Sequence, residues 1–245
     1  MVNVDTVYQR VLALANKEQR GYITPQEFNT YANHAQMEIF EQYFYDTNQF
    51  KRLPGNDSEY HDMVDLIDEK LYIFKKSGTI SHGSSIDSID NDPITQTSLL
   101  YRIGDVYTGN IGMGGNKHVE EVKAGDIIKL QNSPLTKPTW NRPVYYIRNN
   151  NIYFDPINFG NQGSIPYIVN YIVKPRKVNW TYMVVSEKPL YNSTASDHQH
   201  FELHESEETK LVMKILLLAG VGIKDYNLSQ LAAQKEIGKI QQEKQ

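Results

Sequence analysis

The sequence predicts an α+β protein in which N- and C-terminal helices form one helical bundle and the middle forms an inserted antiparallel β barrel or sandwich. Near both ends, apolar residues recur every three or four positions, which is the period of a helix. Between them, short runs of branched and aromatic residues are separated by turn residues, as in strands. We therefore expect a helical bundle domain at 1–76 plus 203–245, a long loop at 77–98, and an antiparallel β domain at 99–202.

Three helices are expected in the N-terminal part. An apolar stripe over residues 4–15 predicts the first. The second should begin at Thr24-Pro25-Gln26-Glu27, because this run places a hydroxyl at the N-cap, proline in the first turn and glutamate where it closes a capping box. We expect that helix to end near Asn48. The third follows the break at Leu53-Pro54-Gly55-Asn56 and carries lysines at 75–76 in its last turn, as the helix dipole favours.

The middle of the chain reads as a loop followed by strands. Residues 77–98 are rich in serine, aspartate and glycine, and their isolated isoleucines indicate a loop that docks on a neighbouring surface. The run Asn149-Asn150-Asn151 predicts a hairpin turn, since asparagine tolerates positive φ. Short strands with prolines at their ends favour an antiparallel arrangement over crossover units. The expected strands are 99–108, 117–122, 143–148, 151–155, 165–173 and 178–185.

Two helices are expected at the C-terminal end. Glutamates at 205, 207 and 208 suit a first turn, and apolar residues over 211–219 form the buried face. We expect this helix to end at Gly220 and Gly222, because glycine commonly terminates helices. A last helix should start near Asn227 and become polar toward Gln245, where it either frays or binds a partner.

Composition excludes several classes of function. The net charge of −4 and the scattered basic residues provide no field for tight nucleic-acid binding. The absence of cysteine excludes disulfides, a thiolate nucleophile and cysteine-bound zinc. The N-terminus has no signal-peptide pattern, and the longest apolar stretch is far below the ~20 residues that cross a bilayer. We expect a soluble protein with no membrane partner.

One histidine cluster could bind a metal. His198, His200 and His204 follow the spacing His-x-His-x-x-x-His beside Glu202 and Glu205, and such side chains can ligate zinc or other divalent metals. The alternative is a polar loop leading into a helix cap. We favour the alternative, because no second-shell pattern or distant ligand accompanies the cluster. We therefore predict no metal site.

A glycine-rich segment at 109–117 invites a phosphate-loop interpretation, because glycine exposes backbone N–H groups to anions. No serine or threonine follows Lys117, and the segment leads into an expected strand instead of a helix. We expect a hairpin tip instead. Its exposed Ile111 and Met113 are candidate partner contacts.

Carboxylates are numerous enough to consider a glycosidase. Glu120 and Glu121, together with Asp126 or Asp155, are the candidates, and such chemistry needs two carboxyl groups ~5 to 9 Å apart. Neighbouring strand residues face opposite sides, so Glu120 and Glu121 cannot both enter one cleft without a bulge. We predict no catalytic residues, no cofactor and no enzymatic activity. The 17 tyrosines suit interfaces or a half-buried core.

Several segments, in order and spacing, resemble the head-to-tail adaptor or tail-stabilising ring proteins of short-tailed bacteriophages, including the crAss-like group. The resemblance covers most of the chain, and its motifs are architectural; the loop at 77–98 has no counterpart. The segments that carry it are Tyr22–Phe28, Ala35–Glu41, Pro143–Tyr146, Ile152–Pro156, Tyr171–Pro175, Phe201–Ser206 and Leu218–Val221.

The resemblance implies a virion protein, assembled in the bacterial host cytoplasm as a ring of about twelve copies below the portal. Genomic DNA would pass through the ring without specific binding, and the acidic charge balance fits a channel that must not trap phosphates. The β tip near Met113 would face the next tail or ring protein. The C-terminal residues 237–245 would dock on the portal protein, with contacts from Ile237, Ile240, Gln241, Gln242 and Lys244.

Two other functions remain open from the sequence. A tail component that binds or degrades host-surface carbohydrate would use the aromatic residues of the β domain as a sugar platform. A host-derived regulatory or chaperone protein would instead be monomeric or dimeric and would occur outside the virion.

Overall fold

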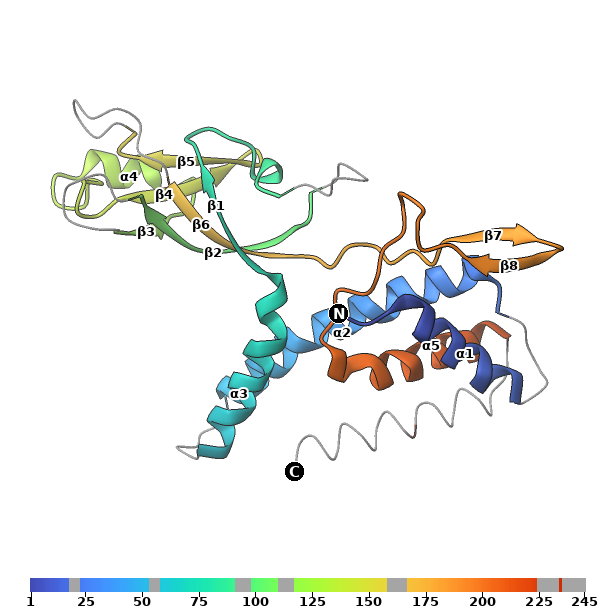
Figure 1. Ribbon diagram of the computed structural model, residues 1–245. Helices are drawn as coiled ribbons and strands as arrows, with labels where there is room; N and C mark the ends of the chain where they lie inside the picture. The colour runs from blue at the N-terminus through green and yellow to red at the C-terminus, as the bar shows by residue number, and fades with distance from the viewer. Residues whose placement is uncertain are drawn as a thin grey trace. The chain divides into compact units, whose positions relative to one another are not determined.

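The computed structural model describes residues 1–17, 23–52, 58–90, 98–109, 117–157, 167–223 and 234. It shows a mixed α+β protein with several helices and a curled six-stranded sheet (Figure 1). The chain divides into two compact units. The helical unit contains Met1–Ile73 and Pro175–Gln245, and the sheet unit contains Phe74–Lys174.

The helical unit is built on four helices: α1 (Val4–Lys17), α2 (Pro25–Arg52), α3 (Ser58–Leu71) and α5 (Glu208–Ile223). Helix α2 packs against α3 and α5, and α1 packs against α5. Their apolar stripes form the core of this unit, as helical periodicity requires. Its fully buried side chains include Val4, Val7, Val11, Phe28, Ala32, Ile39, Phe40, Phe201, Leu203, Leu211 and Ile215.

The start of α2 confirms the capping box. The Glu27 N–H donates to Thr24 Oγ1 at 3.3 Å, and the Thr24 N–H donates to Glu27 Oε2 at 3.0 Å. The two residues thereby satisfy backbone donors that the first helical turn leaves free. The helix runs to Arg52, beyond the expected end near Asn48.

Two other helix ends differ from expectation. Helix α3 ends at Leu71, and a 3-10 turn (Tyr72–Phe74) leads directly into a strand, so residues 75–76 are not helical. Helix α5 does not end at Gly220 but continues to Ile223. Gly220 is buried, and its tertiary packing outweighs the weak helix propensity of glycine. The helix expected from Asn227 lies outside the described residues.

The sheet unit contains six strands in the order β1-β6-β2-β3-β4-β5. Every neighbouring pair is antiparallel except β3 with β4, which run parallel, so the expectation of a wholly antiparallel sheet is wrong at this pair. Parallel neighbours need a long crossover connection, and here it contains a short helix, α4 (Ile127–Asn132), that the sequence did not predict. The strands are β1 (Lys75–Ile80), β2 (Leu100–Thr108), β3 (His118–Glu121), β4 (Val144–Arg148), β5 (Asn151–Asp155) and β6 (Tyr167–Val173).

The expected loop at 77–98 begins as a strand and then bonds to the far edge of the sheet. Strand β1 pairs with β6 from Lys75 to Ile80. Just after it, Gly83 N–H donates to the Ile152 carbonyl at 2.8 Å, and Ile152 N–H donates to the Ser84 carbonyl at 3.1 Å. One continuous segment therefore contacts both β6 and β5. Ile86 in the same segment is buried, as a docking isoleucine should be.

Aromatic packing fills the sheet unit. The rings of Phe154 and Tyr167 stack with centroids 3.6 Å apart. Burial and, to a lesser degree, Asp155 raise the pKa of Tyr167 to about 12. Between β4 and β5, Asn149 and Asn150 take φ values of 50° and 62°, which confirms the expected asparagine turn.

The chain after β6 corrects the expected end of the β domain at residue 202. From Pro175 onward the residues belong to the helical unit. The expected strand 178–185 is extended backbone up to Thr181, followed by a separate two-stranded hairpin of β7 (Tyr182–Val185) and β8 (Lys188–Tyr191). The expected strand therefore exists from Tyr182 to Val185, whereas the residues just before it are bound by side chains of α2.

Candidate interaction surface

Three amide side chains on one face of α2 hold the extended segment 176–180. Asn29, Asn33 and Gln36 lie four and three residues apart and therefore share a helix face. Gln36 Nε2 donates to the Arg176 carbonyl at 2.8 Å, and Gln36 Oε1 accepts from the Glu202 N–H at 3.1 Å. We call Asn29, Asn33 and Gln36 the amide ladder.

The other two amides bind the peptide groups of alternate residues. Asn33 Oδ1 accepts from the Val178 N–H at 2.7 Å, while Asn33 Nδ2 donates to the Val178 carbonyl at 2.9 Å. In the same way, Asn29 Oδ1 accepts from the Trp180 N–H at 2.9 Å, and Asn29 Nδ2 donates to the Trp180 carbonyl at 3.3 Å. The ladder thus takes the place of a neighbouring β-strand and satisfies buried backbone groups.

Trp180 anchors the base of the hairpin to α1. It is 2% exposed, and its Nε1 donates to Asp5 Oδ1 at 2.9 Å. The Tyr8 ring lies 4.2 Å from its ring, and Tyr182 and Tyr191 stack on it at 5.8 and 5.9 Å. Since Tyr182 opens β7 and Tyr191 closes β8, the hairpin leaves the helical unit from a rigid aromatic base.

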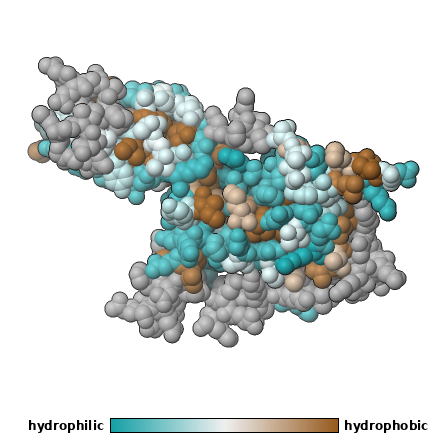
Figure 2. All heavy atoms as spheres, viewed as in Figure 1, coloured by the Kyte–Doolittle hydropathy of each residue, from teal (hydrophilic) through white to brown (hydrophobic). Residues whose placement is uncertain are grey.

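The rest of the β7–β8 hairpin exposes apolar side chains. Met183, Val184 and Leu190 are 54%, 67% and 52% exposed. Figure 1 shows the hairpin extending beyond the helices of its unit, and Figure 2 shows hydrophobic atoms gathered over it with hydrophilic atoms at its turn. An isolated hairpin is marginally stable in water, and contiguous exposed apolar surface marks an interaction site.

The turn of this hairpin is strained. Ser186 and Glu187 take φ values of 50° and 65°, a region that glycine and asparagine adopt more readily. Against α1, the strand β8 also borders a cavity of about 760 Å³ whose lining includes Gln9, Leu12 and Lys188. The strained turn and the exposed apolar strands both cost free energy, and a simple connection between two segments needs neither. The exposed tip of the hairpin is therefore the candidate functional feature.

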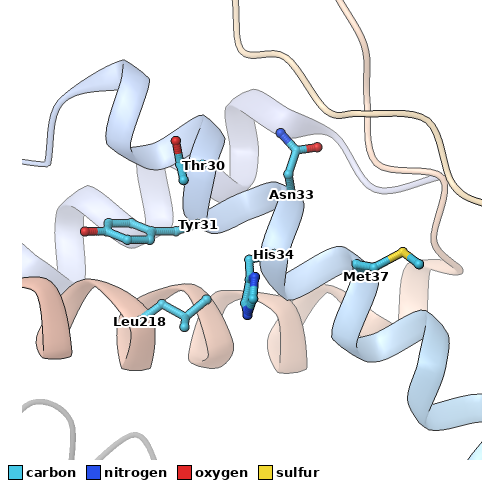
Figure 3. Close-up of a pocket in the computed structure, with 6 residues that line it drawn as sticks. All are labelled: Thr30, Tyr31, Asn33, His34, Met37 and Leu218. Atoms are coloured by element: carbon cyan, nitrogen blue, oxygen red, sulfur yellow. The ribbon is translucent and has the colours of Figure 1, made fainter. Parts of the chain in front are cut away.

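A second feature of the helical unit is a hollow between α2 and α5 (Figure 3). We call it the α2–α5 hollow; its volume is about 510 Å³. Figure 3 shows that α2 contributes most of the labelled side chains and α5 contributes one. The lining residues are Thr30, Tyr31, Asn33, His34, Met37 and Leu218.

Charged groups lie beside this hollow. His34 Nε2 is 3.3 Å from Glu38 Oε1, and Lys214 Nζ is 3.0 Å from Glu38 Oε2. An apolar depression with charges at its edge has the layout of a protein interface, in which an apolar centre is surrounded by a polar rim.

The three histidines of the sequence cluster each make a local contact. His198 Nε2 hydrogen-bonds the Tyr191 hydroxyl at 2.7 Å, and His204 Nδ1 accepts from the Ser206 N–H in the 3-10 turn (Glu205–Glu207) that precedes α5. His200 Nδ1 accepts from the Val4 N–H at 3.3 Å, and burial, with a smaller effect of His198, lowers the pKa of His200. Among the described residues, no three histidines or carboxylates are grouped so that they could hold a metal.

The carboxylates considered for a glycosidase bind four different partners. Glu120 Oε2 lies 3.0 Å from Arg142 Nη2, and Glu121 Oε2 accepts from the Tyr145 hydroxyl at 3.3 Å. Asp126 pairs with Lys129 at 2.9 Å, and Asp155 accepts from Gln131 at 2.6 Å. These contacts describe local stabilising interactions, and none assigns an acid and base pair.

The contacts predicted from sequence stay predictions, because they lie outside the described residues. These are Ile111, Met113, Ile237, Ile240, Gln241, Gln242 and Lys244. Sequence reasoning missed the amide ladder and the hairpin tip. The only available signal for the tip was Met183-Val184-Val185 followed by three polar residues and a second short apolar run.

The chain matches no protein-family model and no curated protein. Within the part of the chain that the structure describes, no helix combines the length and apolar character of a membrane span.

Proposed function

We propose that this chain is a structural virion protein, a head-to-tail adaptor subunit that joins capsid to tail as part of a ring below the portal. The observation that carries the proposal is the exposed apolar β7–β8 hairpin on a rigidly anchored base. A ring subunit needs an apolar surface that stays folded before assembly and becomes buried afterwards. The resemblance to adaptor and tail-stabilising ring proteins supplies the biological setting.

In this proposal the helical unit is one bundle that forms the ring, and the sheet unit is a barrel-like insert presented to the next tail or ring protein. The hydrogen bonds that Ile152 accepts from the Gly83 N–H and donates to the Ser84 carbonyl support a closed sheet, because closure removes the free edges that would otherwise pair with other strands. The order of the units along the chain supports the insert, since the sheet unit occupies one uninterrupted stretch.

The proposed partners are further copies of the chain, about twelve in the ring, and the portal protein. The polar C-terminal residues 237–245 dock on the portal, and the genome passes through the channel without specific binding. The net charge of −4 supports such a channel, because a basic lumen would hold phosphates electrostatically. The site of action is the portal vertex of the virion, after assembly in the host cytoplasm.

Native mass spectrometry with and without a portal preparation tests the proposal. We expect a ring on the portal, and we expect Val184→Asp to reduce ring formation because it places a charge in a surface that is to be buried. Leu135→Asp is the matched control: Leu135 is 95% exposed and lies in the sheet unit. A wild-type chain that stays monomeric and unbound beside the portal would overturn the proposal.

The portal contact has its own test. A chain lacking residues 237–245 should still fold but should lose portal binding in a pull-down. Unchanged binding would defeat the proposed role of the C-terminal segment.

A tail component that binds host-surface carbohydrate is the second candidate. Tyr146 and Tyr153 are a cross-strand pair whose rings stack at 5.3 Å and 17°, and both are partly exposed. A flat aromatic pair can stack on a sugar ring. Glycan-array binding that Tyr153→Ala abolishes, without any portal association, would favour this candidate over the adaptor.

A further inference from the structure

We propose that the β7–β8 hairpin of one copy inserts its apolar tip into the α2–α5 hollow of the next copy, and that this contact is the subunit interface of the ring. The inference rests on the proposed function for the ring. The contact itself can be tested in the absence of a portal.

The hairpin has the form of an inserted element. Its most exposed apolar side chains, Met183 and Val184, are neighbours on β7 and point to opposite faces, so both faces of the tip are apolar next to the turn. Its base is fixed on α1 through Trp180. Because the base is already ordered, insertion loses little conformational entropy beyond the tip. Burial of these side chains would supply the hydrophobic part of the contact.

The hollow has the matching character. Tyr31 and Met37 of α2 and Leu218 of α5 give it apolar walls, and a volume of about 510 Å³ is in the range that accommodates a few inserted side chains. Methionine adapts its shape to a guest better than branched residues do. The hollow therefore offers an apolar receptor for an apolar tip.

The charges at the two surfaces complement each other. The hairpin turn presents Glu187 and Lys188, both exposed. Beside the hollow, the ion pair of Lys214 and Glu38 supplies one basic and one acidic group, and the Glu38 side chain is 42% exposed. Pairing Lys188 with Glu38 and Glu187 with Lys214 would orient the inserted hairpin, since charges at an interface edge contribute more to orientation than to affinity.

The two surfaces are also linked through one residue. Asn33 lines the hollow, and the same side chain binds the Val178 peptide at the base of the hairpin. The receptor surface and the base of the hairpin therefore share one side chain.

The arrangement predicts repetition instead of a symmetric dimer. Hairpin and hollow are different surfaces of one rigid unit, so each copy uses its hairpin on one neighbour and its hollow on another. Such heterologous contacts generate closed rings or open filaments. A second copy of this chain is thus an occupant that accounts for both surfaces at once.

Disulfide trapping tests the contact, because the natural chain contains no cysteine. The full-length double variant Val184→Cys/Met37→Cys should form a ladder of disulfide-linked multimers on mild oxidation. Reduction should convert these multimers back to monomers. Each single variant should stop at dimers. The control Val184→Cys/Leu135→Cys has a fully accessible second thiol, and we expect its ladder to form about tenfold more slowly, since only docking raises the effective thiol concentration.

Two results would overturn the inference. One is a ladder from Val184→Cys/Met37→Cys that forms no faster than the control. The other is an intramolecular link in Met37→Cys/Leu231→Cys, which would assign the hollow to the C-terminal segment of the same chain.

The outcome separates this inference from the proposed function. Rings on the portal without the 37–184 link leave the adaptor role standing and reject the contact. A rapid 37–184 ladder in a chain that does not bind the portal would support the contact and reject the adaptor role.

Discussion

Replacing Asn33 with alanine should destabilise the helical unit by about 2 to 5 kcal/mol, because it removes both hydrogen-bond partners of one buried peptide. Asn33 accepts from the Val178 N–H at 2.7 Å and donates to the Val178 carbonyl at 2.9 Å. Val178 is 2% exposed, so water cannot readily replace the lost partners.

The magnitude follows from two opposing terms. Each buried backbone group left without a partner costs about 1 to 3 kcal/mol, which gives about 2 to 6 kcal/mol for the two groups of Val178. Alanine is a better helix former than asparagine by about 0.5 kcal/mol, which offsets a small part of the loss. The backbone of residues 176–180 carries the hairpin, so the same change should also loosen the proposed subunit contact.

Tryptophan fluorescence can follow this unit alone. The chain has two tryptophans, and Trp140 lies in the sheet unit while Trp180 lies in the helical unit, on the amide ladder. In a Trp140→Phe background, urea unfolding monitored at Trp180 reports the free energy of unfolding of the helical unit. The m-value should stay unchanged if both proteins unfold from the same compact state.

A matched substitution isolates the hydrogen bonds. Asn48 lies on the same helix with an exposed side chain, so Asn48→Ala should change stability only through helix propensity, by a few tenths of a kcal/mol. An Asn33→Ala protein within about 0.5 kcal/mol of Asn48→Ala would refute the reasoning, because surface substitutions vary by that much.

Three further predictions concern other parts of the helical unit. Lys70 Nζ lies 2.6 Å from Oε1 of the buried Glu207, so Lys70→Ala should cost about 3 kcal/mol in urea unfolding by leaving a buried carboxylate unpaired, and adding Glu207→Gln should recover part of it. Thr24→Ala should cost about 1 kcal/mol through the lost N-cap. The backbone N–H and the hydroxyl of Thr24 hydrogen-bond the Glu27 carboxylate and lower the pKa of Glu27. The stabilisation by these hydrogen bonds is present above the unfolded pKa of ~4.3 and is lost as pH falls through the folded pKa. Thr24→Ala keeps the backbone N–H that has the largest effect on this pKa, so the pH dependence is tested with Glu27→Gln. Its urea midpoints should fall less steeply across acidic pH than those of the wild type, and equal slopes would contradict the assignment. Glu187→Gly should raise the thermal midpoint, because glycine adopts positive φ without strain.

Features set by neighbouring residues could be predicted from the sequence. The capping box at Thr24 and Glu27 and the turn at Asn149 and Asn150 depend on side chains within three residues of each other, and both formed as expected. Strand β1 could not be predicted in this way. Lys75-Lys76-Ser77-Gly78-Thr79-Ile80 contains one glycine and few strand formers, and it is a strand because β6 pairs with it along its length.

The candidate surface depends on contacts that are remote in sequence. Asn33 and Val178 are 145 residues apart, and an asparagine inside a helix looks like an ordinary surface residue until its partner is known. Residues 175–202, which include this contact, belong to the helical unit and not to the expected β domain. Hydrophobic pattern identifies which segments are extended, but here polar side chains decide which unit they join.

Two hairpin turns in the described part of the chain show why Glu187 is informative. Between β4 and β5 the chain uses asparagines at positive φ, the residues that tolerate it best after glycine. Between β7 and β8 it uses serine and glutamate in the same conformation, at a cost on the order of 1 kcal/mol relative to glycine. If the turn only joins two strands, Glu187→Gly should stabilise the chain and leave multimer formation unchanged. If Glu187 orients the inserted hairpin, the same substitution should again raise the thermal midpoint but should slow the 37–184 disulfide ladder, so the rate of the ladder distinguishes the two roles.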